Sequence, residues 1–177
     1  MIFWKLLLNN LRLLSYNNTT RLDSMEIIYI NNNSINISPI PIYLTTTKNI
    51  NLTDLDHLCR SVGWIERPIA KVQTAINNSF ITISLFYKNQ NNIYLIGFAR
   101  ATSDGAFNAT IWDVVVHPQF QGKGLGKLLI KSIIKKLKNE KINTITLFAD
   151  PQVVKFYNNL GFIVNPNKTK GMFWHPK

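Results

Sequence analysis

The sequence is poor in cysteine, in acidic residues and in long apolar runs. Cys59 is the single cysteine, so no disulfide can form within the chain, which agrees with a reducing compartment. The three histidines lie far apart, and no Cys and His cluster has the spacing of zinc ligands, so we expect no metal site. A bilayer span needs roughly 18 apolar residues, and no such run is present, so we expect no transmembrane segment.

The scarcity of acidic residues leaves a large positive charge. Lysine and arginine number 20 against 9 aspartates and glutamates, which gives a formal net charge of +11. Such an excess favours an anionic partner, which can be nucleic acid, an anionic membrane or a phosphorylated cofactor. The composition is otherwise globular, with 46% hydrophobic residues, and the 177 residues fit one domain with a short appendage.

The first part of the chain differs from the rest. Lys5, Asn9 and Arg12 interrupt an apolar run at helical spacing, which predicts an amphipathic helix docked on its own domain or, alternatively, in peripheral contact with a membrane or partner. Residues 17–38 are polar and Asn-rich, with a short apolar run at 27–30, and we interpret them as a linker or irregular hairpin. We therefore predict an N-terminal extension over residues 1–39 and one domain over 40–177.

From residue 40 the pattern predicts a mixed α/β (α+β) domain with an antiparallel hairpin at its centre. Strands are expected at 41–46, 80–87, 93–102, 109–116 and 144–149, with two short ones at 161–164 and 172–174. Helices are expected at 52–62, entered through Thr53 or Asp54, and at 68–76, 125–138 and 151–160.

The segment that leads into the helix at 125–138 points to a phosphate ligand. A β-branched strand, 114–116, runs into a glycine-rich turn that opens the helix. Backbone N–H groups at a helix start lack intrahelical partners, and glycines let a ligand approach the backbone closely. Together with Lys123 and Lys127 they predict a phosphate or pyrophosphate site.

Two familiar glycine loops do not fit this segment. When the Gly-Lys pair of a P-loop is aligned on Gly126 and Lys127, Gln121 stands where the first glycine is required. Leu128 then stands where serine or threonine is required. A dinucleotide-binding fingerprint needs its third glycine at position 127 or 129, which are lysine and leucine.

The pattern Gln121-x-x-Gly124-x-Gly126 instead resembles the Gln/Arg-x-x-Gly-x-Gly/Ala signature of the GNAT acetyltransferase superfamily. A second block, Phe156-Tyr157-Asn158-Asn159-Leu160-Gly161-Phe162, resembles the family's usual close. The resemblance covers residues 80–175, and more loosely the chain from residue 42. Residues 149–157 and 170–174 are similar to plastid and cyanobacterial members, which include plant chloroplast enzymes described as serotonin and protein-lysine acetyltransferases. Abundant Asn, Ile and Lys indicate an AT-rich genome, so we expect a plastid-encoded protein of the chloroplast.

The resemblance implies a GNAT fold. Its central sheet is mixed and mostly antiparallel, with about six to seven strands flanked by about four helices, and it splays between the strands at 110–116 and 144–149. Acetyl-CoA, the co-substrate, lies in that gap without a metal. The backbone of Val114, Val115 and Val116 pairs with the pantetheine arm and polarises the carbonyl. The residues implied to hold the pyrophosphate and the rest of the cofactor are Gln121, Gly122, Lys123, Gly124, Leu125, Gly126, Lys127, Tyr157 and Asn158.

The resemblance also implies the catalytic roles. Tyr157 matches the family's tyrosine acid beside the CoA sulfur, although a core tyrosine is the alternative. Functional aspartates fall at Asp113 and Asp150, and either one can accept the amine proton. Asp150 also suits an N-cap, and His117 before Pro118 is expected to be a solvent-facing turn residue. The family often has glutamate near the strand position that Trp112 occupies here.

The sequence thus predicts an N-acetyltransferase that works by direct attack in a ternary complex. The acceptor is a primary amine, which can be an arylalkylamine such as serotonin, a protein lysine or an N-terminal amine. Aromatic residues that can line an acceptor pocket are Trp64, Phe107, Trp112 and Trp174. The alternatives are an acetyl-CoA-binding regulatory protein without turnover and a basic nucleic-acid-binding module, although no nucleic acid is expected. The oligomeric state is left open.

Overall fold

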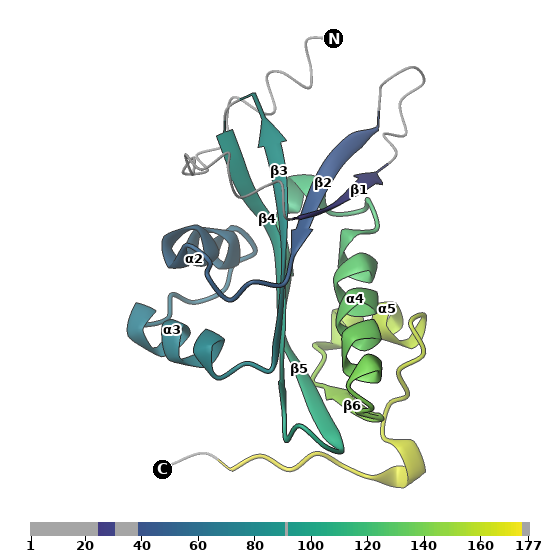
Figure 1. The fold of residues 1–177 in the computed structure, drawn as a ribbon. Coiled ribbons are helices and arrows are strands. Elements are labelled where there is room, and N and C mark those ends of the chain that lie inside the picture. The colour runs from purple at the N-terminus through teal and green to yellow at the C-terminus, as the bar shows by residue number, and fades with distance from the viewer. Residues whose placement is uncertain (1–24, 31–38, 91, 175–177) are drawn as a thin grey trace. The chain divides into compact units, whose positions relative to one another are not determined.

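The computed structural model describes residues 25–30, 39–90 and 92–174 (Figure 1). The chain divides into two compact units, Met1–Thr146 and Leu147–Lys177. The expected amphipathic helix lies outside the described residues.

The first unit is built on one sheet with the strand order β1-β2-β3-β4-β5-β6. The strands are β1 Glu26–Ile30, β2 Ile40–Thr45, β3 Ile81–Asn89, β4 Asn92–Ser103, β5 Asn108–Val116 and β6 Thr144–Leu147. Neighbours from β1 to β5 pair antiparallel. Thr144 N donates to Phe107 O (3.2 Å) and Thr146 Oγ1 to Ala109 O (3.3 Å), so β6 runs parallel to β5. The predicted α+β class with a mixed, mostly antiparallel sheet is confirmed.

Strand β1 lies inside the segment that we interpreted as a linker or irregular hairpin. It pairs along β2, with Glu26 opposite Leu44 and Ile30 opposite Ile40, and Ile30 is buried. The apolar run at 27–30 was therefore the signal of a strand, and the sheet begins before residue 40.

Helices cover both faces of this sheet (Figure 1). Helices α2, Leu52–Ser61, and α3, Ile69–Asn77, lie on one face, and α4, Leu125–Asn139, lies on the other. The side chain that caps α2 is that of Asn51, not of Thr53 or Asp54, because Asn51 Oδ1 accepts from the backbone N of both residues (2.9 and 3.2 Å).

Each face has its own apolar core. The core under α2 and α3 is a cluster of buried residues: Leu55, Leu58, Cys59, Ile76, Leu95, Phe98 and Val115. Helix α4 buries Leu125, Leu129, Ile130, Ile133 and Leu137. Apart from the adjacent pair Leu129 and Ile130, these residues are three or four positions apart, as expected for one face of a helix. Two packed layers hold β4 and β5 between them, and these two strands carry much of the candidate site.

The second unit has short elements only. The helix expected at 151–160 is a 3-10 turn, η3 Pro151–Val153, followed by α5 Val154–Asn158, and a further 3-10 turn is η4 Pro166–Lys168. The strands expected at 161–164 and 172–174 are wrong, since the described residues there form none. Positive φ angles at Gly161 and Asn165 interrupt the extended backbone of the first segment, and the side chains of the second are highly exposed. Apolar composition alone is therefore not enough to form a strand.

Candidate active site

Strand β5 contains a β-bulge at the position of the predicted aspartate. Phe98 lies opposite Val115 and Arg100 lies opposite Trp112, so Asp113 and its successor face a single residue of β4. Asp113 has a φ of 52°, in the left-handed region. For a residue with a Cβ this conformation costs about 1–2 kcal/mol, so the surrounding structure must hold it.

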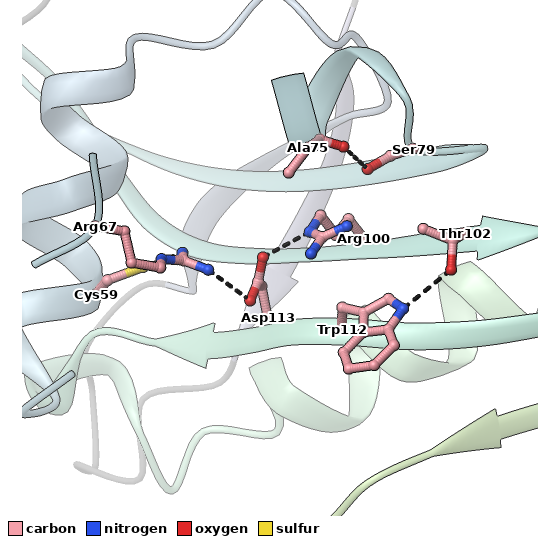
Figure 2. Close-up of polar contacts among 8 residues, drawn as sticks. All are labelled: Cys59, Arg67, Ala75, Ser79, Arg100, Thr102, Trp112 and Asp113. Carbon is pink, nitrogen blue, oxygen red and sulfur yellow. Dashed lines mark hydrogen bonds and ion pairs between the residues drawn. The ribbon is translucent and has the colours of Figure 1, made fainter. Parts of the chain in front are cut away.

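Two arginines hold the Asp113 carboxylate (Figure 2). Arg100 Nε on β4 donates to Asp113 Oδ2 at 2.6 Å, and Arg67 Nη1, from the connection between α2 and α3, donates to Oδ1 at 3.0 Å. The Asp113 and Arg100 side chains are only 16% and 13% exposed, so this pair is poorly screened by solvent. Each carboxylate oxygen already accepts a charge-assisted bond.

The polar cluster continues from Arg67 into α2. Arg67 Nη2 donates to Cys59 Sγ at 3.6 Å, and the Arg67 guanidinium lies 5.9 Å from the ring centroid of Trp64. Burial raises the pKa of the Cys59 thiol to about 11, although the Arg67 charge opposes the rise. The thiol therefore stays protonated at neutral pH and is not poised as a nucleophile. It serves here as an acceptor that orients Arg67.

The segment after β5 is braced at two points. His117 N donates to Ile96 O at 2.8 Å, and the Gln121 side chain donates from Nε2 to Val116 O at 3.0 Å. Between them the 3-10 turn η2, Pro118–Phe120, buries Phe120 almost completely. The end of the strand and the start of the glycine loop are thus fixed together.

His117 is buried, not solvent-facing as expected. Only 9% of it is exposed, its Nδ1 accepts from Gln119 N at 3.3 Å, and its ring lies edge-on to Phe120 at 6.2 Å. Burial lowers the pKa of His117 because the interior disfavours the charged imidazolium. The turn therefore places the ring inward, as a neutral acceptor of a backbone N–H.

The glycine loop leaves backbone N–H groups open at the start of α4. Gly122 and Gly124 have φ angles of 73° and 80°, and a Cβ added to either would meet nothing within 4 Å. The first intrahelical bond runs from Leu128 N to Gly124 O (3.0 Å), and no side chain caps the helix. The N–H groups of the first turn and the exposed Lys127 fit a pyrophosphate.

The other predicted residues lie in the second unit. Tyr157 on α5 is half-buried, with its ring 5.0 Å from that of Phe156 and 5.9 Å from that of Phe162. Burial raises the pKa of Tyr157, and the nearby negative charge of Asp150 raises it further. Asp150 is exposed and precedes η3, but its side chain makes no capping hydrogen bond. Asn158, which is exposed, ends α5.

The predicted residues are thus divided between the units: Asp113 and those at 114–116 and 121–127 lie in the first, and Asp150, Tyr157 and Asn158 in the second. Arg67 and Arg100 were not among the predicted site residues. The sequence did mark Arg100, because it is a charged residue within the apolar strand β4, as Asp113 is within β5.

Of the predicted aromatics in the first unit, Trp64 packs against the core under α2, Phe107 is exposed, and Trp112 Nε1 donates to Thr102 Oγ1 at 3.0 Å.

Comparison with known proteins assigns the fold and the loop to one family. Residues 50–162 match the Acetyltransferase (GNAT) family. The chain belongs to this family. It is therefore an acetyl-CoA-dependent N-acetyltransferase, with acetyl-CoA as co-substrate and an amine as acceptor.

Individual relatives agree with this assignment. The chain is 52% identical over 180 residues to an N-acetyltransferase named ycf52 from Gracilaria tenuistipitata var. liui, with 99% of each protein covered. It is 46% identical over 144 residues to GCN5-related N-acetyltransferase 2, chloroplastic, from Arabidopsis thaliana, with 72% of this chain and 56% of that one covered. A solved structure of a probable acetyltransferase from Staphylococcus aureus has a TM-score of 0.64 at 25% identity, over 76% of this chain and 99% of that chain.

Two kinds of feature, a membrane-spanning helix and a metal-binding cluster, are absent from the described residues. No helix there has the length and apolar character to cross a membrane. No group of three or more His, Cys, Asp or Glu side chains there could hold a metal ion.

The burial of His117 predicts a pH dependence of stability. Because its pKa is lowered in the folded state, the unfolded chain binds more protons as the solution is acidified. The contribution of neutral His117 to the unfolding free energy is present above the unfolded-state pKa of about 6.5. It is lost as the pH falls through the folded-state pKa. We expect H117Q to flatten the decline in unfolding free energy between about pH 7 and 5, measured by urea denaturation. H57Q, a variant of a histidine on α2, is the control, and an unchanged decline in H117Q would contradict the assignment.

Proposed function

We propose that the chain transfers the acetyl group of acetyl-CoA to the primary amine of an arylalkylamine, a protein lysine or a protein N-terminus. The single observation that carries the proposal is the open glycine loop at the start of α4, held against the end of the bulged strand β5. Family membership supports the reaction, and the loop supports this chain's own capacity to hold the co-substrate.

Acetyl-CoA supplies the activated thioester, and the chain supplies the groups that hold it. We assign the pyrophosphate to the backbone N–H groups of residues 122–127, assisted by Lys123 and Lys127, because Gln121 N already donates to Pro118 O (3.2 Å). We assign the pantetheine arm and the thioester carbonyl to the backbone of residues 114–116, with Asn158 contributing to the cofactor site. Backbone N–H groups fixed in advance can stabilise the negative charge that develops on the carbonyl oxygen.

The reaction needs a base for the amine and an acid for the thiolate. The amine lone pair attacks the carbonyl carbon, the C–N bond forms, the C–S bond breaks, and the amine proton leaves to a carboxylate. We assign the acid to Tyr157, whose raised pKa keeps the phenol protonated at neutral pH.

We assign the base to Asp150, either directly or through water. The exposed Asp150 carboxylate makes no capping hydrogen bond, so it is open to an amine. At Asp113 an amine would have to compete with Arg67 and Arg100 for the same two oxygens.

We also propose that the protein works in the plastid and is encoded there. Its similarity to a chloroplastic relative and the AT-rich residue usage support this location. The chain spans 56% of that relative's length, so the relative's activity as a whole is not transferred here.

An amine panel tests the proposed function. The purified protein is incubated with acetyl-CoA and with serotonin, tyramine, spermidine, lysine peptides or N-terminal peptides, and free CoA and mass gain on each acceptor are followed. We expect turnover on one class, which identifies the acceptor. Acetyl-CoA binding without turnover on any of them would contradict the proposal and favour a regulatory protein.

G124A tests the glycine loop. Its methyl group would enter open space, so the folded chain tolerates it sterically, at a backbone cost of about 1–2 kcal/mol. We expect acetyl-CoA affinity to fall, because the methyl group occupies the space of the ligand and the loop shifts away from positive φ. G105A is the matched control, with a φ of 75° and nothing within 4 Å of its Cβ. Equal acetyl-CoA dissociation constants for the two variants, by calorimetry, would refute the loop assignment.

Y157F tests the acid. Removing the hydroxyl should lower kcat by about 10²–10⁴, the usual worth of a positioned acid, and leave acetyl-CoA affinity nearly unchanged. Y43F, on β2, is the control for loss of the hydroxyl from another half-buried tyrosine. If Y157F lost turnover and cofactor binding equally, Tyr157 would be a packing residue.

A further inference from the structure

One polar cluster on the α2 and α3 side of the sheet has no role in the function proposed so far. It runs from Cys59 on α2 through Arg67 to Asp113 on β5 and Arg100 on β4 (Figure 2). We propose that Arg67 and Arg100 are positioning residues: they hold Asp113 in its left-handed conformation and so fix the strand end that receives acetyl-CoA. The role in acetyl-CoA binding rests on the proposed function.

The end of β5, residues 114–116, depends on the conformation of Asp113. The bulge places two residues of β5 opposite one of β4, and Val115 and Val116 follow directly, opposite Phe98 and Gly97. Side chains and hydrogen-bonding groups alternate along a strand, so losing the extra residue would shift every later group to the opposite side. The backbone proposed to pair with acetyl-CoA would then present the wrong groups.

The two arginines reach Asp113 from independent elements. Arg100 is part of β4, the strand that pairs with the bulged strand β5, and its side chain is 13% exposed. Arg67 comes from the connection between α2 and α3 and is itself held by Cys59 Sγ and stacked near Trp64. A carboxylate bonded on both oxygens from two directions cannot rotate without breaking an ion pair. This fixes the side chain, and through it the backbone of a residue in a disfavoured conformation.

The first experiment removes one arginine at a time. We expect R100M and R67M each to raise the acetyl-CoA dissociation constant by about tenfold, the equivalent of the free energy that a left-handed residue costs. R60M is the matched control, because Arg60 also pairs with two acidic residues (3.5 and 3.7 Å) but is 53% exposed. Affinities of R100M and R67M equal to that of R60M would overturn the proposal.

The second experiment asks whether the left-handed backbone is what the arginines support. Glycine adopts positive φ without the penalty of a Cβ, whereas alanine does not. We therefore expect R100M/D113G to bind acetyl-CoA within about threefold of wild type, and R100M/D113A to bind as weakly as R100M or more weakly. Equal affinities of the two double variants would show that the carboxylate, not the backbone, matters, and would overturn the proposal.

D113N separates positioning from proton transfer. Asparagine tolerates the left-handed region and can still accept a bond from an arginine, but it cannot take a proton. We expect D113N to keep kcat within about tenfold of wild type, whereas removing a general base costs about 10²–10⁴ and alters the pH profile. A loss of that size with unchanged acetyl-CoA affinity would make Asp113 the base and overturn the positioning role.

These readouts keep the two proposals distinguishable. Failure of wild type to acetylate any amine would contradict the proposed function. The acetyl-CoA dissociation constants of the arginine variants would still test the positioning role. If wild type bound no acetyl-CoA, the unfolding free energies of R100M/D113G and R100M/D113A would still test whether the arginines support the left-handed backbone of residue 113. We expect R100M/D113G to be the more stable of the two, and equal stability would overturn the positioning role of the arginines.

Discussion

The paired charges of Asp113, Arg67 and Arg100 act at the point where β5 departs from regular pairing. A left-handed aspartate in the middle of a strand is disfavoured, and the pair with Arg100 is shielded from solvent. Removing one partner of such a pair leaves a half-buried charge, so the cluster is costly to break from either side. The bulge is therefore held by long-range contacts and not by the propensity of its own residues.

The strand end beyond the bulge is fixed from its other side as well. His117 N bonds to β4 and the Gln121 side chain bonds to Val116 O, so the residues between the bulge and the glycine loop are held at both ends. The neutral His117 ring accepts a backbone N–H inside the turn, and the loop then opens where Gly122 and Gly124 leave space. If acetyl-CoA binds here as we propose, a strand end held in this way would need little reorganisation to receive it, which is the condition for electrostatic stabilisation by backbone groups.

The sequence was most informative where the signal is local. The glycine loop, the stripe of α4 and the central hairpin each depend on residues a few positions apart, and all are present. The Arg67–Asp113 pair joins residues 46 positions apart, which no periodicity reveals. The solvent-facing position predicted for His117 rests on its place before proline and is wrong, because the ring packs inward against Phe120. The apolar residues near the C-terminus suggested strands, but extended backbone also needs compatible φ angles and a neighbouring strand.

The roles that we propose for Asp113 and Asp150 differ because each task makes a different demand on a carboxylate. A group that fixes backbone must keep both oxygens engaged throughout the reaction, since releasing them would release the strand. A base must instead offer a free oxygen and change its charge in each cycle. Asp113 bears the bonds suited to the first task, and Asp150, exposed and without a capping bond, has the freedom suited to the second. If one residue did both, protonation would weaken its ion pairs at the moment when the thioester must be held most firmly. The proposed division of the two tasks would therefore preserve the proposed cofactor site during proton transfer.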